Sequence, residues 1–220
     1  MAEKHFHKEL DRIKKMILSL GAQVEERFHM AIKAIENKDA TIAKWIIDSD
    51  HEIDETEVNI EEECLKILAL YQPVAVDLRF IIAVIKINND LERIADEACN
   101  IAERLAIILK HKDIDIFFDY SIMWAKTADM LKQSLDSLIN LNSGLAKQVI
   151  HADDEIDHLD NAAYDEIKAH MHHLPEHMGY WINLMYISRH IERIADHAVN
   201  IAEEVLYLIE GEIVRHGEIS

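Results

Sequence analysis

Two segments that lie 100 residues apart carry the same acidic residues at the same spacing. Residues 91–103 read LERIADEACNIAE, and residues 191–203 read IERIADHAVNIAE. Glu92 and Asp96 of the first copy correspond to Glu192 and Asp196 of the second. Core packing alone would repeat the apolar residues and allow the polar residues to differ between the two copies. The fixed polar positions therefore indicate a site that is built twice.

The repeated polar residues fall on one side of a helix. At about 100° per residue they form a narrow stripe beside the apolar face. The stripes consist of Glu92, Asp96, Asn100 and Glu103 in the first copy and of Glu192, Asp196, Asn200 and Glu203 in the second. A second duplicated set precedes each stripe: Asp50 and Asp54 correspond to Asp153 and Asp157 at an offset of 103 residues.

Carboxylates that two neighbouring helices bring together either have raised pKa values or require a cation. Oxygen ligands suit hard ions such as iron, manganese, magnesium or calcium better than zinc, which would act only as a substitute. We therefore expect one metal site per half. The expected ligands are Glu92, Asp96, Asp50 and Asp54 in the first half and Glu192, Asp196, Asp153 and Asp157 in the second. The alternative is a solvated acidic face with Arg93 and Arg193 as partners.

Long helices must position these residues, because 220 residues contain only 5 Gly and 2 Pro. Breaks in the pattern predict helices over residues 5–36, 40–70 and 73–110, a fourth ending near 142–144, a fifth running to about 172, and a sixth over 175–211. The expected fold is all-α, with two tandem antiparallel three-helix bundles over residues 1–110 and 111–220. Residues 110–115 are the expected link.

Composition excludes several classes of protein. The formal net charge of −19 argues against a nucleic-acid partner, because phosphate backbones need a positive surface. Two cysteines make no disulfide framework, and neither a signal segment nor an apolar stretch long enough to span a bilayer is apparent. We therefore expect a cytoplasmic protein that meets the membrane only through partners.

The segment QPVAVDLR at residues 72–79, followed by LERIAD at 91–96 and by the second copy at 191–203, resembles the PhoU family of phosphate-signalling regulators. The resemblance covers essentially the whole chain. It implies two three-helix bundles and a cytoplasmic regulator that restrains phosphate uptake and the phosphate-starvation response. Its implied partners are the ATPase of the phosphate ABC transporter and a phosphate-sensing histidine kinase.

The resemblance also implies multinuclear iron clusters on the acid-xxx-Asp motifs, which here are Glu92/Asp96 with Asp50/Asp54 and Glu192/Asp196 with Asp153/Asp157. The chain departs from the family pattern in two ways. Ala95 and Ala195 stand where the family usually has Gly, and His158 and Tyr164 replace the Glu55 and Glu61 of the first half. The two sites are therefore expected to differ in metal load. Apolar surface on the long helices also suggests a homodimer.

Two other functions fit part of the sequence. A ferritin-like di-metal enzyme or storage protein uses two Glu-x-x-His motifs, and the chain contains Glu26-x-x-His29 and Glu155-x-x-His158. These motifs lie on non-equivalent helices, so one bundle is not expected to hold both. A helical interaction scaffold without metal is the second alternative. We find no catalytic constellation of residues and expect no enzyme activity.

Overall fold

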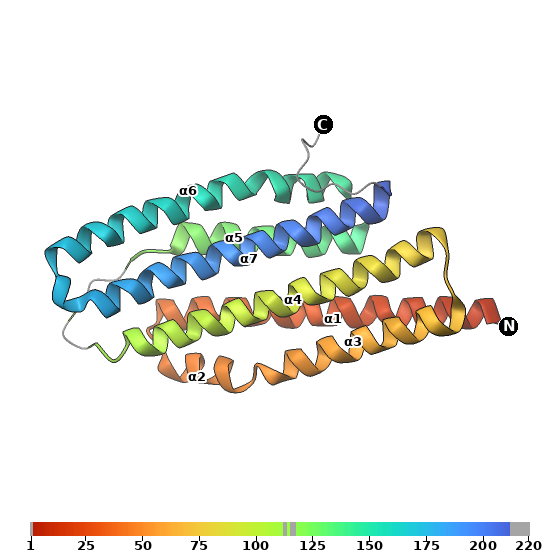
Figure 1. Cartoon of the computed structure of the whole chain (residues 1–220), viewed down its shortest axis with the longest axis horizontal. Helices are drawn as coiled ribbons and strands as arrows, with labels where there is room; N and C mark the ends of the chain where they lie inside the picture. Colours follow the sequence, from red (N-terminus) through yellow and green to blue (C-terminus); the bar gives the residue numbers. More distant parts are fainter. Residues whose placement is uncertain (1, 112–113, 115–117, 212–220) are drawn as a thin grey trace.

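The computed structural model describes residues 2–111, 114 and 118–211. These residues form seven α-helices and one short 3-10 turn (Figure 1). The helices are α1 (Ala2–Glu36), α2 (Ala40–Asp48), α3 (His51–Tyr71), α4 (Ala75–Ile108), α5 (Ser121–Asn140), α6 (Ser143–His173) and α7 (Met178–Glu210), and the turn η1 (Pro175–His177) precedes α7. The predicted all-α fold is confirmed.

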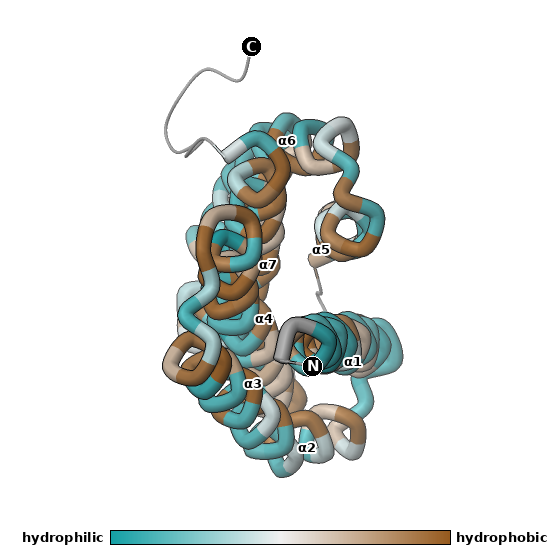
Figure 2. The backbone as a smooth tube through the Cα atoms, turned by 90° about the vertical axis from the view of Figure 1, so that its right-hand side faces the viewer, coloured by the Kyte–Doolittle hydropathy of each residue, from teal (hydrophilic) through white to brown (hydrophobic). Residues whose placement is uncertain are grey.

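The helices form two facing layers. Seen along the long axis, α6, α7, α4 and α3 make one curved layer, and α5 and α1 lie opposite it (Figure 2). Helices α1–α4 make the first half and α5–α7 the second. The predicted link over residues 110–115 falls partly outside the described residues, and the domain boundary stays a prediction.

Helices α4 and α7 are the central pair of the fold. They run antiparallel and pack along their lengths, while α3 flanks α4 and α6 flanks α7 (Figures 1 and 2). The repeated small and branched residues Ile94, Ala95, Ile194 and Ala195 are at most 1% exposed. The apolar side of each repeated segment thus packs in the core, and the acidic stripe lies beside it, where its side chains can form a site.

Local residue chemistry explains several helix boundaries. The Asp39 Oδ1 accepts hydrogen bonds from the Thr41 and Ile42 N–H groups at 2.7 and 3.2 Å, which caps the start of α2. Helix α7 ends where Gly211 adopts the left-handed conformation with φ of 76°. Pro73 and Pro175 come just before the long helices rather than inside them, so α4 starts at Ala75 and Pro175 opens η1.

The prediction of one helix over residues 40–70 is wrong, because the chain breaks at Ser49 and Asp50 into α2 and α3. The Ser49 hydroxyl donates to the Trp45 carbonyl at 2.7 Å. The buried Arg27 of α1 donates to the carbonyls of Ile46 and Ser49 at 3.1 and 3.2 Å. These bonds add side-chain donors to the carbonyl groups around the end of α2, and they fix the position of Asp50.

Replacing Arg27 by Met should lower the free energy of unfolding by about 2–3 kcal/mol, because two carbonyl groups at the helix break lose a charged donor. Urea unfolding followed by circular dichroism measures the change. The matched control is Arg12→Met on the same helix, whose exposed side chain pairs with Glu63 at 3.0 Å and should cost less than about 1 kcal/mol. Equal losses in both variants would contradict a special role for Arg27.

Candidate metal centres

The first candidate site lies between α3 and α4. Asp50 precedes α3, Asp54 lies in its first turn, and Asp96 projects from the middle of α4. Each of these three residues offers a carboxylate oxygen, and the three oxygens lie within 4.8 Å of one another. Three converging carboxylates at this separation can hold a hard cation.

Glu92 adjoins this group, one helical turn before Asp96 on α4. Its Oε2 is buried and accepts no hydrogen bond from the described residues. Its charged neighbour Arg93 lies 3.4 Å away without making a hydrogen bond, and a cation would stabilise this buried oxygen further. The expected ligand set of the first half therefore fits a metal ion, with Asp50, Asp54 and Asp96 closest together.

The electrostatics of the first site reflect this crowding. Burial, followed by the charges of Asp54 and Asp96, raises the pKa of Asp50. Burial is also the main cause that raises the pKa values of Glu92 and Asp96. Arg93 opposes both shifts, with its Nε 3.4 Å from Glu92 Oε2 and its Nη1 3.2 Å from Asp96 Oδ2. One arginine thus neutralises part of the cluster.

The second candidate site lies between α6 and α7. Burial and the neighbouring Asp196 charge raise the pKa of Asp153 to about 6. The same two causes raise the pKa of Glu192 to about 7. Asp157 in turn raises the pKa of Asp196, after the larger effect of burial. The four expected carboxylates of this half therefore also act on one another.

The second site is looser than the first, and the carboxylate oxygens that accept no hydrogen bond belong in part to different positions of the repeat. Within the described part of the chain, its four carboxylates do not form a triplet as close as that of Asp50, Asp54 and Asp96. Asp153 Oδ1 and Glu192 Oε2 are nevertheless buried and accept no hydrogen bond from described residues. These two atoms point to the same need for a cation as Glu92 does.

Arg189 has no equivalent in the first half, where Asn89 occupies its position. Its Nη1 lies 2.6 Å from Glu192 Oε1 and 3.7 Å from Asp160 Oδ2. Arg193, which sequence analysis considered as a partner of this stripe, instead reaches Glu97 of α4 at 3.0 Å. Arg189 and, after it, Arg193 oppose the larger effect of burial on the pKa of Asp196, so the second site has one arginine more than the repeat alone provides.

A set of polar pairs between α4 and α7, here called the seam, was missed by the sequence analysis. Glu97 Oε2 lies 2.6 Å from His190 Nδ1, and Asp90 Oδ1 lies 2.9 Å from His197 Nδ1. Asn200, which we assigned to the second stripe, donates to Asp90 at 3.1 Å and so belongs to the seam. The signal was present: positions 90 and 97 correspond to 190 and 197, and a spacing of seven keeps both on one helix face.

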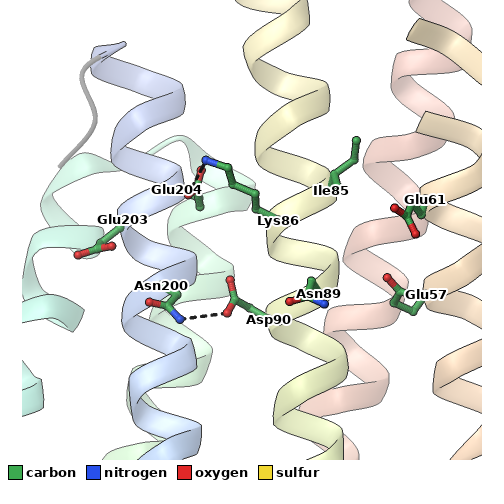
Figure 3. Close-up of a pocket in the computed structure, with 9 residues that line it drawn as sticks. All are labelled: Glu57, Glu61, Ile85, Lys86, Asn89, Asp90, Asn200, Glu203 and Glu204. Atoms are coloured by element: carbon green, nitrogen blue, oxygen red, sulfur yellow. Dashed lines mark hydrogen bonds and ion pairs between the residues drawn. The ribbon is translucent and has the colours of Figure 1, made fainter. Parts of the chain in front are cut away.

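A cleft of about 680 Å³ opens beside the seam, across α3, α4 and α7 (Figure 3). Its lining is acidic, with Lys86 as its basic residue; Lys86 is held by Glu204 at 2.9 Å. The acidic lining residues are Glu57, Glu61, Asp90, Glu203 and Glu204. The cleft connects the acidic side of α3 with the C-terminal part of the second stripe.

Other residues singled out from the sequence have structural roles. Burial and the nearby Asp50 charge raise the pKa of the Cys99 thiol to about 12, so it stays protonated and is a poor metal ligand. Ala95 and Ala195 are buried in the core rather than facing the carboxylates. Tyr164, at the position of Glu61, is half-exposed, so the second half lacks one acidic group of the first.

The two Glu-x-x-His motifs do not share a bundle core. Glu26 and His29 lie on α1, whereas Glu155 and His158 lie on α6, in the other half and the other layer (Figure 2). The Glu155 carboxylate forms an ion pair with Lys126, with 2.9 Å between Oε2 and Nζ. This placement speaks against a ferritin-like di-metal centre.

A helical protein made of two copies of one acidic helical unit is the class that this fold and these sites define. The PhoU domain matches twice, over residues 17–105 and 121–205. The chain therefore belongs to the PhoU family.

Individual relatives cover nearly the whole chain. The "Phosphate-specific transport system accessory protein PhoU homolog" of Aquifex aeolicus is 38% identical over 96% of this chain and 96% of its own length. The protein of the same name from Pseudomonas aeruginosa is 34% identical over 96% of this chain and 88% of its own length.

Solved structures show the same fold. The crystal structure of PhoU from Pseudomonas aeruginosa matches with a TM-score of 0.90 and 33% identity, over 94% of this chain and all of that one. The phosphate transport system regulatory protein PhoU from Streptococcus pneumoniae matches with a TM-score of 0.87 and 30% identity, over 96% of this chain and 99% of that one.

Within the described residues, none of the helices is long and apolar enough to cross a membrane.

The raised pKa of Glu192 predicts a pH-dependent stability in protein kept metal-free with a chelator. Because the folded pKa of about 7 exceeds the ordinary value of 4.5, ionisation costs folding free energy; the cost is absent below the ordinary pKa and complete above the folded one. Glu192→Gln should therefore raise the free energy of unfolding by about 1–2 kcal/mol at about pH 8 and leave it unchanged at about pH 4.

Urea titrations at both pH values measure this difference. The control is Glu166→Gln, which alters an exposed carboxyl group on α6 and should have little effect at either pH. A Glu192→Gln protein that is no more stable than the unmodified chain at the higher pH would contradict the prediction.

Proposed function

We propose that this protein is an accessory regulator of phosphate transport that lowers phosphate uptake and phosphate-starvation signalling. The observation that carries the proposal is the match of both repeats, over 96% of the chain, to relatives named as accessory proteins of the phosphate-specific transport system. The relatives are named as accessory and regulatory proteins rather than as enzymes. Its action is binding, at the cytoplasmic side of the transporter.

The proposed partners are the ATPase of the phosphate ABC transporter and a phosphate-sensing histidine kinase, and the proposed assembly is a homodimer. The charge of the chain supports partners with basic surfaces, because −19 over 220 residues favours association with positive patches. The acidic cleft across α3, α4 and α7 is a concave surface of that sign.

Metal ions are the proposed cofactors of both candidate centres. Asp50, Asp54, Glu92 and Asp96 would hold a hard ion in the first half, and Asp153, Asp157, Glu192 and Asp196 would hold one in the second. Iron in a multinuclear cluster is the first candidate, followed by manganese or magnesium, with zinc as a substitute. The bound ion would neutralise the crowded carboxylates and fasten α3 to α4 and α6 to α7.

Metal content tests the cofactor directly. Protein purified without an affinity tag or chelator should contain stoichiometric iron or another hard ion by mass spectrometry. The variant Glu92→Ala/Asp96→Ala/Glu192→Ala/Asp196→Ala should lose it while keeping its helicity, since it removes the α4 and α7 ligands of both centres. Equal metal content in the two proteins, or none in either, would leave the acidic stripes as solvated faces of a metal-free scaffold.

Deleting the gene tests the regulatory role. Phosphate uptake and expression of a phosphate-starvation reporter should both rise in the deletion strain when phosphate is plentiful, because the restraint is removed. The full-length gene should restore the restraint, and the four-site Ala variant shows whether the metal centres are needed for it. Unchanged uptake and reporter expression after deletion would overturn the proposed function.

A further inference from the structure

One end of the bundle, around the loop between α3 and α4, exposes an unusual share of aliphatic side chains. We call it the apolar end, and Figure 2 looks onto it. Seven of the fifteen large apolar residues exposed in the described part of the chain lie there: Leu70, Val74, Val76, Leu78, Ile139, Leu141 and Ile209. Leu70 and Val74 are 76% and 74% exposed, so they protrude into solvent. Grouped apolar exposure of this kind marks an interaction surface.

Three of these seven residues, Val76, Leu141 and Ile209, line a hollow of about 460 Å³. It lies between the ends of α1, α4, α5 and α7. Most of its lining is apolar, including Leu10, Ile17, Val76, Phe80 and Leu141. The hollow thus links exposed apolar residues at the start of α4 and at the ends of α5 and α7.

The backbone at the apolar end is held in an unusual conformation. Gln72, Ala75 and Leu141 have φ values of 47°, 50° and 48°, and they are three of the four non-glycine residues with positive φ in the described ranges. Each such residue costs free energy, and strain of this kind concentrates at functional surfaces. Here it shapes the two loops that present Val74 and Leu141 to solvent.

The same end carries basic residues in a chain that is otherwise strongly acidic. Residues 4–15 of α1 contain five Lys or Arg against two Asp or Glu, a net charge of +3, which leaves −22 on the rest of the chain. Lys4, Lys8, Lys14 and Lys15 are all exposed, and the N-terminus lies at this end of the molecule (Figure 1). Lys14 and Arg79 line the hollow beside Asp11 and Asp77, so the basic excess of this end comes from the exposed lysines of α1.

We propose that the apolar end docks on the surface of an anionic lipid bilayer. Aliphatic side chains enter the boundary between headgroups and acyl chains, and each lysine close to an anionic surface adds to the attraction. The rest of the chain carries a net charge of −22, which the same surface repels, so the lysines of α1 favour an approach by this end. The charge pattern therefore fixes an orientation as well as a contact.

The residue types favour a lipid surface over a protein partner. The residues that contribute most to the binding energy of protein interfaces are enriched in Trp, Tyr and Arg, and Leu and Val are under-represented among them. All seven exposed residues of the apolar end are Leu, Val or Ile. The inference does not require a transporter subunit, and it goes beyond the proposed regulatory function by giving the protein its own affinity for the membrane.

Vesicle flotation tests the proposal with the full chain. The protein should float with vesicles of phosphatidylcholine mixed with phosphatidylglycerol and stay in solution with vesicles of phosphatidylcholine alone. Rising salt should release it, because the lysine contribution is screened over about 8 Å at physiological ionic strength. A chain that binds neither kind of vesicle, or both equally, would overturn the proposal.

Two sets of substitutions locate the contact. Leu70→Ser/Val74→Ser/Val76→Ser removes protruding apolar groups, and Lys4→Glu/Lys8→Glu/Lys15→Glu reverses the charge of α1. Each should weaken binding to the anionic vesicles at least about tenfold. All six positions are exposed, so helicity and thermal stability should be retained.

Matched controls change the same residue types elsewhere. Val58→Ser/Ile122→Ser/Ile182→Ser alters exposed apolar residues away from the apolar end, and Lys44→Glu/Lys132→Glu/Lys168→Glu makes the same change in net charge. Both controls should bind within about twofold of the unmodified chain. Equal losses in the controls would show that the apolar end has no special part. If the Ser variant keeps its lipid binding but no longer binds the purified transporter ATPase, the surface belongs to a protein partner instead.

Discussion

Helices α4 and α7 can pack along their whole lengths only if charged side chains between them find partners. Glu97 is 4% exposed, and a carboxylate that deep in the protein would be very costly alone. His190 and Arg193 of α7 supply its partners, and together they hold the pKa of Glu97 below its ordinary value against the effect of burial. The layer of α6, α7, α4 and α3 is built outward from this contact, so the seam also determines where both candidate metal centres lie.

The two halves repeat the positions of their carboxylates but not the means of neutralising them. In the first half Arg93, within the repeated segment, contacts Glu92 and Asp96 of the same helix. In the second half Arg189 contacts Glu192, while Arg193 pairs with Glu97 across the seam and also opposes the effect of burial, which raises the pKa of Asp196. A duplicated site can thus keep its acidic groups while each copy adapts to the neighbours that the other half gives it.

Sequence periodicity was sufficient for the all-α fold, since long helices with few Gly and Pro leave little choice of class. It also placed Asp50, Asp54 and Asp96, which the structure brings together. The break at Ser49 was not predictable, because the Arg27 side chain that stabilises it comes from another helix. The seam was missed for a similar reason, because a comparison of the two copies reveals only the residues that they share. Glu97 and His197 occupy equivalent positions but differ in residue type, and this difference lets them take part in the seam.

The seam has a consequence for pairing specificity. Antiparallel pairing of α4 with a second α4 would oppose Asp90 to Glu97 and Lys86 to Arg104, which are like charges at each point. In the real contact these positions meet His197, His190, Glu204 and the ring of Tyr186. Helix α4 is thus complementary to α7 and mismatched to a second copy of itself. The polar pairs of the seam therefore favour the contact between α4 and α7 over a contact between two copies of α4.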